Sequence, residues 1–131
     1  MGSQNELKIT RLMERIKKDF EFVQKDPRVE AILLYGSYIY GMEHNRSDID
    51  VCVVSKDENI YDTWSFIMEN FEGDISKYDV RLFRELPLKI QGEIIKNGKL
   101  VYSKDKIELY AFFYPYRKRY NDWKFRVEHC I

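Results

Sequence analysis

Cysteine and histidine are scarce in this chain of 131 residues, and their scarcity argues against two kinds of site. Cys52 and Cys130 lie far apart, and neither belongs to a C-x-x-C pair, so the sequence predicts no disulfide framework. His44 and His129 have no metal-ligand spacing to each other or to the cysteines, so a zinc site is not expected. A reduced, cytoplasmic chain is the simplest interpretation.

Membrane, secretion and linker signals are also missing. No stretch of 18 apolar residues occurs, and the first residues, M-G-S-Q-N-E-L-K, have no apolar region of a secretion signal. The 22 basic residues balance 22 acidic ones, so the composition gives no general affinity for nucleic acid. Without repeats or a Pro/Gly/Ser-rich linker, we expect residues 1–131 to form one domain with no membrane partner. A homo-oligomer is left open.

Hydrophobic periodicity predicts an α/β chain, of the α+β kind, with four strands. The strands are expected over Val29–Tyr35, Ile49–Val54, Tyr78–Phe83 and Leu100–Tyr102, and the helices over Leu7–Val23, Ser37–Tyr40, Asn59–Phe71, Pro87–Lys96 and from Asp105 to the C-terminus. Residues 42–46 read as a polar loop, and Pro115 predicts a kink or break in the long last helix. This order predicts a small mixed sheet whose helices cover one face.

A Gly-Ser turn and an acidic pair stand between the first two strands. Gly36-Ser37 is followed by ten residues and then by Asp48-Ile49-Asp50. The period of a strand places the two carboxylates on one face, about 7 Å apart along the chain. Gly36 lets a phosphate approach the backbone, and Ser37 can cap the following short helix and offer its hydroxyl. Asp48 and Asp50 can hold Mg²⁺, which prefers oxygen ligands and substrate phosphates.

A third carboxylate is expected in a later strand. Asp79 lies in K-Y-D-V-R-L-F, where an acid in mid-strand is disfavoured by propensity and needs a reason. One reason is catalytic: Asp79 would bind a second metal ion and accept the proton of an attacking hydroxyl. The other is structural: Arg81 lies on the same face and would form an ion pair with it. Both interpretations remain open at this point.

Gly-Ser, ten residues and Asp-x-Asp, with a later Asp in a strand, resemble the DNA polymerase β-type nucleotidyltransferase superfamily, and the short length resembles its minimal, MNT-type members. The resemblance implies a polymerase β-like fold and transfer of a nucleoside monophosphate from ATP to a hydroxyl. It also implies that Gly36 and Ser37 bind the triphosphate. Asp48, Asp50 and Asp79 would bind two Mg²⁺ ions, with Asp79 as the base.

The sequence departs from this family at one position. Members often carry a basic residue before the second glycine of the turn, where this chain has Tyr40 in G-S-Y-I-Y-G. Loss of that charge would weaken nucleotide binding or change the nucleotide preference. Arg46 either compensates or is simply solvated. Tyr38 and Tyr40 could stack on a base, although packing around the turn is the simpler interpretation.

The C-terminal segment Y-P-Y-R-K-R-Y-N-D-W-K-F-R resembles minimal members that pair with HEPN-type RNase toxins. That resemblance implies an antitoxin that adds AMP to a tyrosine of its toxin. The simpler alternative is a surface helix. Its aromatic side chains would then mostly pack in the core, and its basic side chains would be solvated. The aromatic residues are Phe112, Phe113, Tyr116, Tyr120 and Trp123, and the basic ones are Arg117, Lys118, Arg119, Lys124 and Arg126.

Three functional hypotheses follow. The first is a Mg²⁺-dependent adenylyltransferase that modifies a hydroxyl of a HEPN-type toxin. The second is a protein with a weakened site, as Tyr40 suggests, that neutralises its partner by binding alone. The third keeps the chemistry but uses a small molecule or an RNA end as acceptor. It ranks lower because one small domain has little spare surface for such a substrate.

Overall fold

The fold is built on a four-stranded mixed sheet. It is seen in a computed structural model that describes residues 2–41 and 48–130. The strands are β1 (Val29–Tyr35), β2 (Ile49–Ser55), β3 (Tyr78–Leu82) and β4 (Lys99–Ser103), in the order β3-β2-β1-β4. β1 pairs antiparallel with β2 and β4, whereas β2 and β3 are parallel. The predicted mixed sheet is therefore confirmed.

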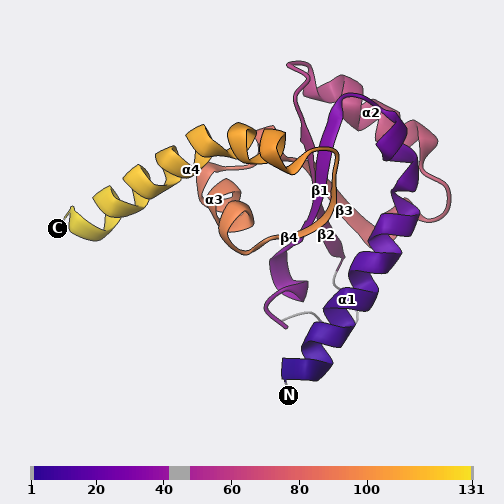
Figure 1. Ribbon diagram of the computed structural model, residues 1–131, viewed down its shortest axis with the longest axis horizontal. Helices are drawn as coiled ribbons and strands as arrows, with labels where there is room; N and C mark the ends of the chain where they lie inside the picture. Colours follow the sequence, from indigo (N-terminus) through magenta and orange to yellow (C-terminus); the bar gives the residue numbers. More distant parts are fainter. Residues whose placement is uncertain (1, 42–47, 131) are drawn as a thin grey trace.

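Four α-helices surround the sheet in the described residues (Figure 1). They are α1 (Gly2–Asp19), α2 (Ile60–Asn70), α3 (Leu88–Asn97) and α4 (Lys106–His129). Short 3₁₀ turns occur at η1 (Glu21–Lys25), η2 (Gly36–Tyr38), η3 (Ile75–Lys77) and η4 (Phe83–Glu85). α2 lies in the connection between the parallel strands β2 and β3, as such a crossover requires.

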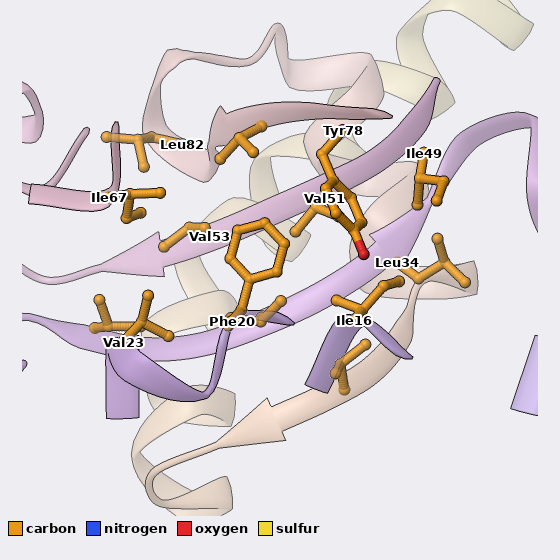
Figure 2. Close-up of a cluster of buried hydrophobic side chains, with 14 residues drawn as sticks. Ile16, Phe20, Val23, Leu34, Ile49, Val51, Val53, Ile67, Tyr78 and Leu82 are labelled. Atoms are coloured by element: carbon orange, nitrogen blue, oxygen red, sulfur yellow. The ribbon is translucent and has the colours of Figure 1, made fainter. Parts of the chain in front are cut away.

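Helices cover both faces of the sheet, so the prediction of one covered face was wrong. On one face, Leu34, Val51 and Val53 pack with Phe20, at the end of α1, and with Ile67 of α2 (Figure 2). On the other face, the core of Ala31, Leu33, Cys52 and Val54 packs with Phe83 after β3, with Ile94 of α3, and with Leu109 and Phe113 of α4. The apolar runs 31–34 in β1 and 51–54 in β2 were the sequence signal, because a strand segment buried on both sides has no polar alternation.

The first helix begins and ends earlier than its periodicity predicts, at Gly2 and Asp19 instead of Leu7 and Val23. α1 ends at Asp19, and the chain continues to Lys25 in the tighter turn η1. Phe20 is fully buried at this change of direction, with its ring centroid 5.0 Å from that of Tyr78 and 5.2 Å from that of Phe71. Val23 is also fully buried. Both residues of the predicted helix are therefore in the core, although the backbone that carries them is not α-helical to Val23.

The C-terminal helix α4 runs unbroken through Pro115, so the predicted break does not occur. Pro115 lies on the exposed side of α4, where a missing backbone hydrogen bond is tolerated because water can replace it. Tyr120 packs on Gly92 of α3, and beyond it α4 extends away from the sheet (Figure 1). No helix in the described part of the chain is long and apolar enough to cross a membrane.

Candidate active site

Two of the predicted acidic residues lie side by side at one end of the sheet. In the parallel ladder, Asp50 of β2 is the direct partner of Asp79 of β3, and in the antiparallel ladder Asp50 is the partner of Tyr35. Residues that are directly opposite share a face, so the three side chains form a row across β1, β2 and β3. These side chains lie on the same face of the sheet as Leu33 and Cys52, which is the face that α3 and α4 cover.

Gly36 makes direct room for the Asp50 carboxylate. An ideal Cβ added to Gly36 would lie 2.2 Å from Asp50 Oδ2, which no real side chain could tolerate. Gly36 also has a φ of +82°, in the region that favours glycine. Both facts explain why glycine stands at the end of β1: it turns the chain and leaves the acid against the backbone.

Ser37 lies within η2, half-buried, and does not cap it as predicted. The residue before this turn is Tyr35, with extended backbone and no side-chain cap, and the turn is closed by the Ile39 N–H donating to the Gly36 carbonyl at 3.1 Å. Gly36 itself is the first residue of the turn, which moves Ser37 inside it. The Ser37 hydroxyl has no hydrogen bond to any residue that the structure describes, so it is free to meet a ligand.

Three carboxylates repel one another at this end of the sheet. The pKa of Asp50 is raised to about 6, first because the group is half-buried and then because Asp79 and Asp48 are near; Arg81 acts in the opposite direction. Asp48 is exposed at the start of β2. A divalent cation relieves such repulsion, and the donors are all oxygen atoms, so these residues fit Mg²⁺.

Asp79 is turned toward Arg81, as the structural interpretation of this acid predicts. The Arg81 Nε donates to Asp79 Oδ1 at 3.0 Å, and the side chains are 54% and 38% exposed. With Asp79 engaged in this way, no group of three His, Cys, Asp or Glu side chains in the described ranges is gathered tightly enough to hold a metal. An ion pair this exposed is worth about 0–1 kcal/mol, so a metal ion could displace it.

The aromatic residues of the turn divide between the core and the surface. Tyr38 packs against the core on the α1 side, which agrees with the packing interpretation. Tyr40 is 53% exposed and lines a cavity. Arg46, which could compensate for the missing basic residue, lies outside the described residues, as does the rest of the loop 42–47.

Sequence reasoning missed the contribution of α3. A cavity of about 100 Å³ is lined by residues 35, 36, 39 and 40 from one side and by residues 90, 93, 94, 97 and 98 from the other. Tyr35 lines this cavity and is also the ladder partner of Asp50. Burial is the main cause that raises the pKa of its phenol, followed by the nearby Cys52, Asp50 and Asp79. The register of β1 against β2 could have revealed Tyr35, but nothing local places α3 here.

Comparison with known proteins decides the family. Residues 14–107, which contain all four strands and every predicted site residue, match the model of the polymerase beta nucleotidyltransferase family. The chain belongs to that family. It is also 43% identical over 100 residues to MJ1547 of Methanocaldococcus jannaschii, a proposed protein adenylyltransferase, and the match covers 76% of each chain. The predicted nucleotidyltransferase is thus confirmed.

Solved structures share the fold of this family member. One is a toxin–antitoxin complex with AMP-PNP, with a TM-score of 0.57, 20% identity, and coverage of 88% of this chain and 89% of the other. Another is a mutant of the toxin–antitoxin pair MntA-HpeT, with a TM-score of 0.53, 19% identity and 88% of each chain covered. At this identity the likeness establishes the polymerase β-like fold that the sequence predicts.

Proposed function

We propose that this nucleotidyltransferase transfers AMP from ATP to a tyrosine hydroxyl of a HEPN-type toxin and so acts as its antitoxin. The observation that carries the proposal is the row of Asp50 and Asp79 with Gly36 against Asp50. The relative that is 43% identical is a proposed protein adenylyltransferase, and the toxin–antitoxin complex of the same fold contains AMP-PNP. In this proposal, residues 1–131 form a single minimal nucleotidyltransferase domain.

The roles of the acids follow from their positions. Asp48, Asp50 and Asp79 would hold two Mg²⁺ ions, which when bound neutralise the charge of the phosphates. Gly36 and Ser37 lie beside Asp50, where the backbone and a free hydroxyl can contact the triphosphate. The acceptor oxygen forms a bond to the α-phosphorus as the bond to pyrophosphate breaks, and Asp79 takes the proton of the hydroxyl.

Labelled ATP tests this function directly. The protein is incubated with Mg²⁺, ATP labelled at the α-phosphate, and a HEPN-type toxin, beginning with one encoded beside this chain. Label is expected on a toxin tyrosine with wild-type protein and should be lost with Asp48→Asn. The matched control is Asp62→Asn on the exposed side of α2, which should transfer label like the wild type. Label on RNA or on a small molecule instead would reassign the acceptor.

A second function is favoured by one observation. Tyr40 stands where the family often has a cation, so the site could be weakened and the protein could neutralise its partner by binding alone. Growth rescue of cells that express the toxin separates the two functions. Rescue that survives Asp48→Asn supports neutralisation by binding, whereas rescue that is lost together with label transfer supports the enzyme.

A further inference from the structure

The cavity between the Gly36 turn and α3 is lined mostly by apolar and aromatic side chains, as is typical of a site for a planar ligand. Ile39 from the strand side and Ile90 from α3 are half-buried, and Ile94 beneath them is 1% exposed. Tyr40 lines the cavity with a ring that is 53% exposed. Small-molecule sites are typically concave and mostly apolar, with aromatic side chains in their walls. A planar, partly apolar ligand therefore fits this cavity.

Two polar side chains interrupt the apolar lining. Glu93 and Asn97 are four residues apart on α3, so they lie on the same side of the helix, and both line the cavity half-buried. Neither side chain has a hydrogen bond or ion pair within the ranges 2–41 and 48–130. Both side chains are therefore available to a ligand, and a few polar groups in a mostly apolar pocket are what orients a bound small molecule.

Two residues that line the cavity are also neighbours of the Asp50 carboxylate. Gly36 lines it and also contacts the Asp50 carboxylate, and Tyr35 lines it and is the ladder partner of Asp50. A nucleotide whose phosphates lie at Gly36 and Asp50 would therefore have this cavity beside it. The remaining part of such a ligand is a sugar and a base, and the base is its planar part.

We propose that this cavity binds the base of the nucleotide and that Glu93 and Asn97 select a base with an amino group beside a ring nitrogen, which is adenine in ATP. The inference rests on the proposed function, because it takes the phosphates to lie at Gly36 and the acids. The Asn97 amide both donates and accepts, which matches the ring nitrogen and the amino group on one edge of adenine. The Glu93 carboxylate can accept only, so it suits the same amino group and disfavours a carbonyl oxygen in its place. Tyr40 is positioned to stack on the ring.

Binding measurements with and without a base test the assignment. The ligands are the Mg²⁺ complexes of ATP, GTP, CTP, UTP and inorganic tripolyphosphate, which has no base. Wild-type protein should bind ATP about tenfold more tightly than UTP. Asn97→Ala should weaken ATP binding about tenfold, and Glu93→Gln should reduce the preference for ATP over UTP and GTP. Neither variant should change tripolyphosphate binding. Lys89→Ala, an exposed position on the same helix, is the matched control.

A cavity-filling variant gives a second test. Ile90→Trp should block ATP but leave tripolyphosphate binding intact, and thermal unfolding with circular dichroism shows whether the variant is folded. If Ile90→Trp does not fold, Asn97→Ala decides the question. The base assignment is wrong if wild type binds the four nucleotides equally, or if folded variants bind ATP like the wild type.

Tripolyphosphate separates a failure of this inference from a failure of the proposed function. Binding of tripolyphosphate that requires Asp50, together with no effect of the cavity variants, keeps the phosphate site and rejects the base site. Wild-type protein that binds neither ATP nor tripolyphosphate would reject the phosphate site itself, and the base assignment with it.

Discussion

Asp79 and Arg81 form a hydrogen-bonded ion pair on the same face of β3, with Arg81 Nε 3.0 Å from Asp79 Oδ1. The same carboxylate is the ladder neighbour of Asp50. The structural and catalytic interpretations of Asp79 therefore do not exclude each other. A weak, exposed pair can hold the acid in the absence of metal, and metal then competes with Arg81 for the same oxygen atoms.

Arg81→Gln should tighten Mg²⁺ binding to the nucleotide-free protein roughly two- to fivefold, because an exposed pair of this kind contributes about 0–1 kcal/mol. Removing the cation frees Asp79 and also makes the potential around Asp50 more negative. Titration calorimetry or competition with Mn²⁺ measures the change. Lys89→Gln removes an exposed charge on α3 and should leave the affinity unchanged. Unchanged or weaker metal binding by Arg81→Gln would show that Asp79 is not a ligand.

Gly36→Ala should abolish metal and nucleotide binding, because its Cβ would occupy the place of Asp50 Oδ2. The positive φ adds a cost of about 1–2 kcal/mol to folding. Gly73→Ala is the matched control: its φ is +101°, but the nearest atom to its Cβ is 4.0 Å away. Both variants should unfold at lower temperature, and only Gly36→Ala should lose binding in calorimetry. Equal binding by both would mean that Asp50 has no role at the turn.

Local sequence signals predicted the strands far better than the long-range packing. The apolar runs and the mid-strand acid were sufficient to place Asp50 and Asp79 in strands, whereas the pairing of those two strands is seen only in the structure. Phe20 and Val23 lie in the predicted helix Leu7–Val23, but their spacing of three residues fits an α-helix and a 3₁₀ turn alike, so the spacing did not reveal where α1 ends. The contributions of Glu93 and Asn97 depend on which sheet face α3 covers, and no local pattern encodes that choice.

Gly92→Ala should loosen the attachment of α4, because its Cβ would lie 2.1 Å from the ring of Tyr120. Overpacking of this kind costs about 1–3 kcal/mol, although alanine alone would favour the helix by about 1 kcal/mol. Denaturant unfolding measures the loss. In a Tyr120→Ala background the same substitution should be neutral or stabilising, since the clash is absent. An equal loss in both backgrounds would rule out the contact as the cause.

The buried pair of Asp26 and Arg28 predicts how stability depends on pH. Asp26 is 6% exposed and accepts hydrogen bonds from the backbone N–H, Nε and Nη2 of Arg28, at 2.9, 2.9 and 2.6 Å for the shortest contact of each. These side-chain hydrogen bonds, more than any other cause, lower the pKa of Asp26. A carboxyl whose pKa is lower in the folded state stabilises the fold above its unfolded pKa of about 3.9. That contribution is lost as the pH falls through the folded value.

Asp26→Asn should therefore destabilise the protein at pH 7 by about 1.5–3 kcal/mol, the range for hydrogen bonds to charged groups. The difference from wild type should shrink as the pH falls below about 4, because wild-type Asp26 then takes up a proton and loses the charge that the variant lacks. Urea unfolding between pH 7 and pH 3 measures both curves. Asp122→Asn, on the exposed end of α4, should follow the wild type throughout. A difference that stays constant with pH would mean that the variant loses packing and not charge.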